Sequence, residues 1–215
     1  QALNILINQG EEIRYIVMKE DWLDVATPMS ILKANELVLK NLKMEYKGEV
    51  EKYVTIKGNV SVGKGTLIRS GSYILGPVII GENCEIGPNC FIRPFTSIGN
   101  NVRIGNGVEI KNSIVMDDTK IGHLSYVGDS IIGRNCNFGA GTIIANLRFD
   151  RRNVPIIICG KKIDSELKKL GVIMGDNVQT GINVSIDTGT VICENVIVMP
   201  HAFVSGYVEA GSVVA

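Results

Sequence analysis

Residues 120 to 129, KIGHLSYVGD, contain His123, one of the two histidines in this 215-residue chain. A histidine with an ordinary pKa of about 6.5 can accept a proton from a reacting group near neutral pH. Arg93 and Lys111, which are 18 residues apart, also stand out, because two cations held close together suit a phosphate group. The chain therefore offers a candidate general base and a candidate pair of phosphate-binding cations.

A six-residue repeat supplies the elements that must position these side chains. From Tyr53 onward an aliphatic residue returns every six positions, with a small or β-branched residue two places before it. The aliphatic residues are Ile56, Val62, Ile68, Ile74, Ile80, Ile86, Ile92, Ile98, Ile104 and Ile110. Such a period predicts an all-β solenoid, in which three short strands close one triangular coil of about 18 residues.

The period changes around His123. It reaches Met116, shortens to five residues at Ile121, returns to six at Val127 and shortens again at Ile132. We interpret the shortened corners as a local change that re-aims the histidine segment.

Residues 147 to 171, LRFDRRNVPIIICGKKIDSELKKLG, fit no coil and are rich in Lys and Arg. A long irregular segment inside a compact fold is usually functional or disordered. We expect it to be a loop ejected from the solenoid, after which the coils resume at Met174.

Stacked coils bring distant residues side by side. Residues one coil apart lie at about the 4.8 Å spacing of a β-ladder, which places Lys111 beside Arg93. Like charges at that spacing repel, so we expect an anion such as phosphate between them; the alternative is that both point into solvent. Tyr126 lies on the same face and His123 at the corner before it, with Ala140 one coil above. A lone surface histidine is usually inert, but these polar neighbours favour a functional role.

Composition argues against several other classes of protein. Lys and Arg total 22, as do Asp and Glu, so the basic surface of a nucleic-acid-binding protein is not expected. No apolar run is long enough to cross a bilayer, and no signal peptide opens the sequence. The five cysteines form no C-x-x-C pair, which disfavours a disulfide framework or a zinc site. We expect free thiols and a reducing, cytoplasmic location.

The segment VEIKNSIVMDDTKIGHLSYVGDSIIGRNCNFGAGTIIANLRFD closely resembles the acetyltransferase domain of the bifunctional N-acetylglucosamine-1-phosphate uridyltransferase/glucosamine-1-phosphate acetyltransferases. The long loop after ANLRFD is similar to the archaeal branch, whose members join a sugar-1-phosphate nucleotidylyltransferase to this domain. The resemblance implies a left-handed parallel β-helix of hexapeptide repeats. It also implies acetyl transfer from acetyl-CoA to a hexosamine 1-phosphate without a metal, and a homotrimer with shared active sites.

The resemblance also implies a role for each matching residue. His123 would be the general base. Arg93 and Lys111 would bind the phosphate of the acceptor. The remaining contacts would be Tyr126, Asn137 and Asn146 to the amino sugar, and Ala140 and Asn146 to acetyl-CoA.

Three positions depart from the bacterial pattern. Leu147 stands where bacterial relatives have Tyr, and Ile182 and Pro200 replace two small residues that contact the coenzyme. The coenzyme contacts beyond residue 147 are therefore left open.

The N-terminal segment GEEIRYIVMKEDWLDVATPMSILKANELVLKNL resembles the end of a sugar-phosphate nucleotidylyltransferase domain. Thr27 followed by Pro28 predicts a helix start, with the helix continuing to about Leu42. Asp24 matches a metal ligand of that family, where Mg²⁺ would serve nucleotidyl transfer only in an intact domain. We expect a fragment of a longer protein, with residues 1–45 as this remnant and residues 46–215 as the β-helix.

Three alternatives compete with the acetyltransferase hypothesis. A γ-type carbonic anhydrase has the same solenoid but needs three histidines for its metal, and this chain has only His123 and His201. A purely structural β-helix would not need the polar constellation around His123. A related acetyltransferase with another acceptor stays open, as does the choice between glucosamine and galactosamine.

Overall fold

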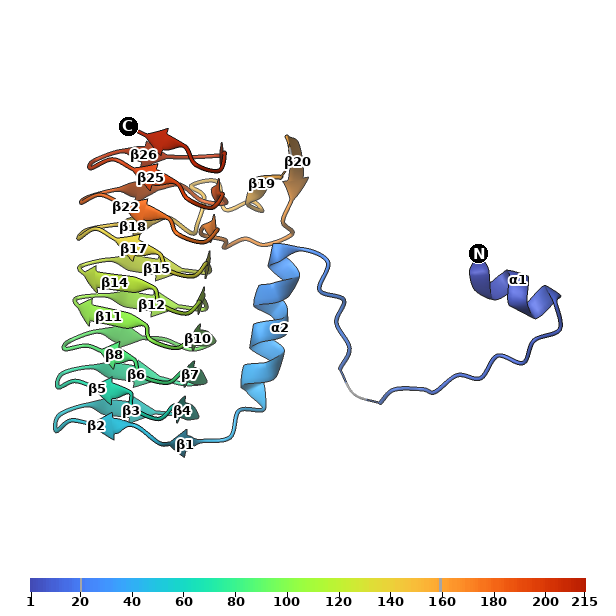
Figure 1. The fold of residues 1–215 in the computed structure, drawn as a ribbon, viewed down its shortest axis with the longest axis horizontal. Coiled ribbons are helices and arrows are strands. Elements are labelled where there is room, and N and C mark those ends of the chain that lie inside the picture. Colours follow the sequence, from blue (N-terminus) through green and yellow to red (C-terminus); the bar gives the residue numbers. More distant parts are fainter. Residues whose placement is uncertain (20, 159) are drawn as a thin grey trace.

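The hexads form a left-handed parallel β-helix, which confirms the predicted solenoid. The computed structural model describes residues 1–19, 21–158 and 160–215. Three parallel sheets run along the stack of coils, one on each side of the prism (Figure 1). Each complete coil contributes one short strand to each sheet, so the position of a hexad within its coil decides its face, and a residue's place in the hexad decides whether it points inward.

The first sheet carries the strands that face helix α2. It consists of β1 (Glu45–Tyr46), β4 (Val60–Val62), β7 (Val78–Ile80), β10 (Thr96–Ile98), β13 (Ile114–Val115), β16 (Ile131–Ile132), β21 (Ile173–Met174), β24 (Val191–Ile192) and β27 (Tyr207–Val208). The second sheet follows it in each coil. It consists of β2 (Glu49–Val50), β5 (Leu67–Ile68), β8 (Glu85–Ile86), β11 (Arg103–Asn106), β14 (Lys120–His123), β17 (Asn137–Phe138), β22 (Gln179–Thr180), β25 (Ile197–Val198) and β28 (Val213–Val214).

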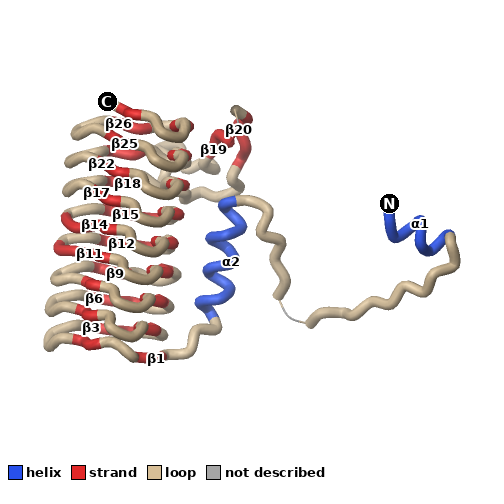
Figure 2. Tube along the Cα trace, viewed as in Figure 1, coloured by secondary structure: helices blue, strands red, loops and turns tan. Residues whose placement is uncertain are grey.

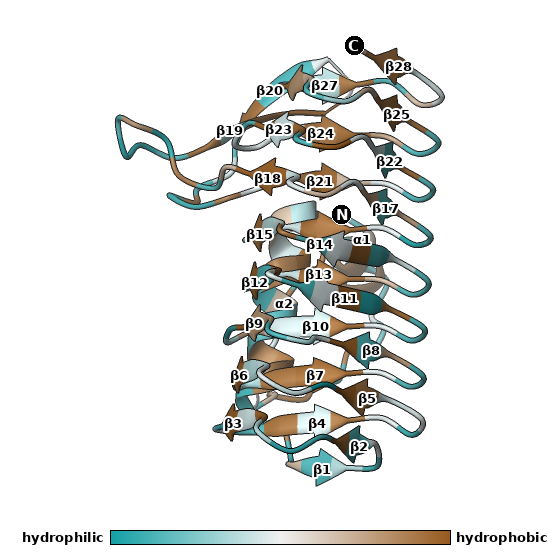
Figure 3. Cartoon of the chain, turned by 90° about the vertical axis from the view of Figure 1, so that its left-hand side faces the viewer, coloured by the Kyte–Doolittle hydropathy of each residue, from teal (hydrophilic) through white to brown (hydrophobic). Residues whose placement is uncertain are grey.

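The third sheet holds most of the candidate site. It consists of β3 (Thr55–Lys57), β6 (Tyr73–Leu75), β9 (Phe91–Ile92), β12 (Glu109–Lys111), β15 (Tyr126–Gly128), β18 (Ile143–Ile144), β23 (Ser185–Ile186) and β26 (Phe203–Val204). Many strands are apolar over their whole length, whereas the turns between them include many hydrophilic residues, as Figure 3 shows by hydropathy.

The interior of the prism is filled by the aliphatic series. Ile68, Ile86 and Ile104 are inaccessible to solvent, and the same holds along most of the stack. Cys84, Cys90 and Cys136 occupy the small inward positions as buried free thiols. Cys159 lies outside the described residues. The hexad pattern is therefore a packing pattern, and the side chains that can meet a ligand are the outward ones.

The predicted phase is wrong at one residue. Val115, and not Met116, continues the inward series, because β13 pairs Val115 with Ile98. Val115 is buried, whereas Met116 points outward and is half-buried. Residues 114 to 116 are all apolar, so the sequence did not distinguish them. The first shortened corner therefore follows Ile110 and the second follows Val127.

Both shortened corners lie between the third and the first sheet, stacked one coil apart. Each turns at a residue with a left-handed backbone, Asn112 with φ 44° and Asp129 with φ 52°. Asn and Asp tolerate this conformation better than other side-chain-bearing residues. The ejected segment leaves from the next corner above, after β18, so three consecutive irregular corners share one edge of the prism.

The ejected segment is not the plain loop that was expected. Its middle forms an antiparallel hairpin, β19 (Pro155–Ile158) and β20 (Lys161–Asp164), beside the upper coils (Figure 2). Apolar residues at its base, Val154, Ile156 and Leu170, are buried against the outer face of the first sheet.

In the part of the chain that the structure describes, two helices precede the coils. Helix α2 (Pro28–Lys40) begins as predicted, with the Thr27 side chain accepting a hydrogen bond from Ser30 N at 3.2 Å, and it ends two residues before Leu42. It packs along the first sheet, where Leu32 joins the buried cluster at the base of the ejected segment. Helix α1 (Ala2–Asn8) is exposed throughout. Among the described residues, no helix has the length and apolar character needed to cross a membrane.

Candidate functional site

The outer face of the third sheet gathers the predicted phosphate-binding residues and Tyr126. Lys111 ends β12, Tyr126 begins β15, and Arg93 directly follows β9. The N–H of Arg93 donates to the carbonyl of Ile110 at 2.8 Å, which places Arg93 one coil below Lys111, as predicted.

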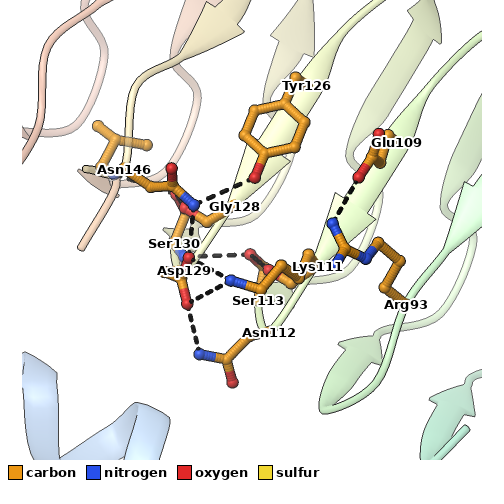
Figure 4. A network of polar contacts seen from close by, with 11 residues as sticks. Arg93, Glu109, Lys111, Asn112, Ser113, Tyr126, Gly128, Asp129, Ser130 and Asn146 are labelled. Carbon is orange, nitrogen blue, oxygen red and sulfur yellow. Dashed lines mark hydrogen bonds and ion pairs between the residues drawn. The ribbon is translucent and has the colours of Figure 1, made fainter. Parts of the chain in front are cut away.

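Each cation is paired with a carboxylate of the chain itself, and a phosphate between the two cations stays a prediction. Arg93 Nη1 lies 2.8 Å from Glu109 Oε1, and Lys111 Nζ lies 2.9 Å from Asp129 Oδ2 (Figure 4). The two pairs differ in their environment. The side chains of Arg93 and Glu109 are both 36% exposed, whereas the side chain of Asp129 is only 5% exposed. The carboxylates of Glu109 and Asp129 thus offset the repulsion between the stacked cations.

Tyr126 and Asn146 meet on the same face. The Asn146 side-chain amide donates to Tyr126 Oη at 3.1 Å and to Asp129 Oδ2 at 2.6 Å. Asn146 is the second residue after β18, where the ejected segment departs. The Asp129 carboxylate therefore links Lys111 to Asn146, and the Asn146 amide in turn links Asp129 to Tyr126, as Figure 4 shows.

His123 is the last residue of β14 in the second sheet, at the corner that leads into β15 of the third sheet. Its side chain is exposed, and its carbonyl accepts hydrogen bonds from Ser125 Oγ at 2.8 Å and from Gly141 N at 3.3 Å. These bonds fix the corner while the imidazole is left on the surface. No hydrogen bond joins the imidazole to the Tyr126–Asn146 pair in the described part of the chain.

Ala140 lies one coil above His123, as predicted. The pairing of β14 with β17 sets this register, because Ile121 pairs with Phe138. The Ala140 carbonyl accepts a hydrogen bond from Asn183 N at 2.8 Å, while its own N–H has no acceptor among the described residues. Asn137 is exposed on β17, in the second sheet, and is not part of the network in Figure 4.

A cavity of about 670 Å³ lies directly above this network on the same sheet. It is lined mainly by apolar side chains, among them Ile143, Leu147, Phe149 and Phe203. Ile143 pairs with Tyr126 in the sheet, so the cavity adjoins the polar network. Its volume is in the range of small-molecule sites.

Two acidic residues of the site, Glu109 and Asp129, were not predicted. Counting coils did not single out Asp129, because the coil step here is 17 residues and Lys111 pairs with Gly128. Asp24 is exposed in the segment before α2. In residues 1–19, 21–158 and 160–215, no group of three or more His, Cys, Asp or Glu side chains is arranged to hold a metal ion.

Fold and site together define a hexapeptide-repeat β-helix. The outer face of its third sheet carries a polar network and, next to it, a cavity of small-molecule size. The chain belongs to the family described as the GMPPB C-terminal domain, which matches residues 74–209. It is 44% identical to the bifunctional protein GlmU of Methanocaldococcus jannaschii over 194 residues, 90% of this chain and 47% of the relative. It is 43% identical to the bifunctional sugar-1-phosphate nucleotidylyltransferase/acetyltransferase of Sulfurisphaera tokodaii over 211 residues, 98% of this chain and 52% of the relative.

The chain thus spans about half the length of the curated relatives it matches. Among solved structures, PerB from Caulobacter crescentus in complex with CoA and GDP-perosamine is similar at a TM-score of 0.35 and 13% identity. That match covers 95% of this chain and 72% of PerB.

Proposed function

We propose that this chain transfers an acetyl group from acetyl-CoA to the amine of a hexosamine 1-phosphate, with glucosamine 1-phosphate as the first candidate. The observation that carries the proposal is the network in Figure 4, which holds Lys111, Tyr126 and Asn146 on one face beside the His123 corner. Two relatives of more than 40% identity bear names that fit this chemistry.

The reaction assigns one step to each part of the site. The imidazole of His123 takes a proton from the sugar ammonium, because only the neutral amine is a nucleophile. The amine then attacks the thioester carbonyl, the new C–N bond forms, and the C–S bond breaks. The proton held by His123 passes to the leaving thiolate, and the nitrogen, which is positively charged after the attack, loses a second proton to solvent to give the neutral amide. The unpartnered N–H of Ala140 is a donor for the carbonyl oxygen as it gains negative charge.

The two ion pairs still leave donors for a phosphate. A guanidinium has five N–H groups, and Arg93 uses one of them on Glu109. An ammonium has three, and Lys111 directs its charge to both oxygens of Asp129 at 3.2 and 2.9 Å. Charge-assisted hydrogen bonds from the remaining donors would bind the phosphate of the acceptor.

The test is turnover by the 215-residue chain with acetyl-CoA and three acceptors: glucosamine 1-phosphate, galactosamine 1-phosphate and glucosamine. Released coenzyme A is measured with a thiol reagent. We expect a kcat/KM at least about 10-fold higher for a 1-phosphate than for glucosamine, because charged hydrogen bonds are lost without it. No turnover with any acceptor would leave a structural β-helix, and equal turnover would indicate a different acceptor.

We also propose that the chain assembles as a homotrimer with active sites shared between subunits. Ile143, Phe149 and Phe203 support this, because these apolar side chains are exposed beside the candidate site. Sedimentation at micromolar concentration should give a multiple of three chains, and a fully active monomer would contradict it. Within a longer protein of the relatives' length, we propose sugar-1-phosphate nucleotidyl transfer with Mg²⁺ by the part that precedes the β-helix.

A further inference from the structure

The second shortened corner carries a buried carboxylate that contacts three side chains. Asp129 is 4% exposed. It accepts hydrogen bonds from Lys111 Nζ at 2.9 and 3.2 Å, from Asn112 Nδ2 at 2.8 Å and from Asn146 Nδ2 at 2.6 Å (Figure 4). A buried charge is tolerated when it is paired and hydrogen-bonded in this way.

The backbone of Asp129 is also held by hydrogen bonds, through both its N–H and its carbonyl. Its N–H donates to the carbonyl of Lys111 at 2.9 Å, and its carbonyl accepts from Gly171 N at 2.8 Å. Gly171 is where the ejected segment returns, and Asn146 is where it leaves. The residue therefore fixes the cation below it and both ends of the segment above it.

Gly128 leaves the room in which the other two side chains meet. A Cβ atom at Gly128 would lie 2.6 Å from Tyr126 Oη and 2.6 Å from Asn146 Nδ2. The Tyr126 ring and the Asn146 amide thus approach each other over a residue without a side chain. Asp129, next in the chain, holds the Asn146 amide in this place.

We propose that Asp129 is a positioning residue, which sets the distance between the phosphate-binding cation Lys111 and the sugar-binding pair Tyr126 and Asn146. The inference rests on the proposed function. Asp129 touches neither substrate in this scheme. It acts by holding Lys111 on one side and Asn146 on the other, so that an acceptor anchored by its phosphate presents its amine toward the His123 corner.

Charge and position predict opposite effects when the carboxylate is removed. In Asp129→Asn the Lys111 ammonium loses its counter-charge, so its attraction for a phosphate is unchanged or stronger. The geometry between Lys111 and Asn146 is lost at the same time, and a misplacement of about 1 Å can lower a rate by up to 10²-fold. If Asp129 were needed only to keep the chain folded, its substitution would weaken phosphate binding and lower kcat together.

The experiment compares kcat for the acceptor with the inhibition constant of glucose 1-phosphate, a phosphate ligand that has no amine. For Asp129→Asn we expect kcat to fall by about 10-fold or more, while the inhibition constant is unchanged or lower. A folded variant that keeps its kcat, or whose inhibition constant rises along with the loss of kcat, overturns the proposal. If Asp129→Asn does not fold, Asp129→Glu replaces it, because this variant keeps the charge but displaces it. The same result is expected: a lower kcat with an inhibition constant that is unchanged or lower.

Asn112→Gly is the matched control. It removes one donor to the same carboxylate, and glycine accepts the left-handed backbone at this position. We expect both constants to stay within about 2-fold, because Lys111 and Asn146 are still held. An inactive wild-type chain would count against the proposed function itself, so the two failures are distinguishable.

Discussion

Arg69 in the lower coils and Arg93 in the candidate site occupy the same place in their hexads, directly after an inward isoleucine. Arg69 Nε lies 2.8 Å from Glu85, and Arg93 Nη1 lies 2.8 Å from Glu109, with similar exposure of all four side chains. An arginine–glutamate pair on the outer face is therefore an ordinary feature of this solenoid. What distinguishes the site is the next coil, where Lys111 is paired with a carboxylate that is buried at a shortened corner.

The lower coils and the coils of the candidate site have the same kind of interior but different outer corners. Inward aliphatic residues are buried in both, and cysteines take the small inward position below the site and above it. A regular coil has no reason to shorten its corner, because the six-residue step already closes the triangle. The shortened corners instead draw Asn112, Asp129 and the base of the ejected segment together along one edge.

The two histidines give the largest expected difference between regions. His123→Ala should lower kcat by about 10²–10⁴-fold, the usual contribution of a general base. His201→Ala is the control, because His201 is also an exposed corner residue but lies in the upper coils. The measurement is the kcat of both folded variants by steady-state kinetics. Equal activity of the two variants would remove His123 from the mechanism.

Thiol reactivity tests whether the core is the same in both regions. Burial raises the pKa of Cys84 and Cys90, and raises that of Cys136 to about 11. A thiol with such a pKa has on the order of 10²-fold less reactive thiolate at pH 8 than an ordinary thiol. Iodoacetamide labelling, followed by mass spectrometry, should therefore modify the half-buried Cys193 well before these three.

Urea removes this protection and serves as the control, since all five thiols of the unfolded chain should then react alike. Raising the pH toward 11 should speed labelling of Cys136 in the folded chain, because its proton is lost only near that pH. Rapid labelling of Cys136 but not Cys84 at pH 8 would show that the coils around the site are less well packed than those below.

Arg93→Ala and Arg69→Ala form a matched pair for the phosphate assignment. Arg93→Ala should raise KM for the sugar 1-phosphate by roughly 10-fold or more, because a charge-assisted hydrogen bond is lost. Arg69→Ala removes the ion pairs with Glu85 and Glu51 in the lower coils and should leave KM unchanged. Lys111→Ala is a less selective probe, since it also strands the buried Asp129 carboxylate. A parallel rise in the KM of acetyl-CoA would argue against a phosphate role for Arg93.

Periodicity predicted the coils because a six-residue repeat of buried aliphatic residues admits few other structures. It placed Arg93, Lys111 and Tyr126 on one face, since register follows from counting. It failed at Met116, where three adjacent apolar residues allow more than one phase. The hairpin within residues 147–171 was missed, because its strands follow no hexad. The Asp129 network depends on side-chain conformations at irregular corners, and these are set by tertiary contacts.

The smallest effect is expected from the lysines of the ejected segment. Lys161 and Lys168 are exposed, and an exposed charge remains solvated and screened by salt. Substituting both by alanine should change stability by no more than about 0.5 kcal/mol and leave the KM of acetyl-CoA within about 2-fold. Thermal unfolding and steady-state kinetics at low and high salt measure these quantities. A salt-dependent rise in the KM of acetyl-CoA of about 10-fold or more would instead assign these lysines to the coenzyme phosphates. The ejected segment would then belong to the working face of the molecule together with the coils from which it departs.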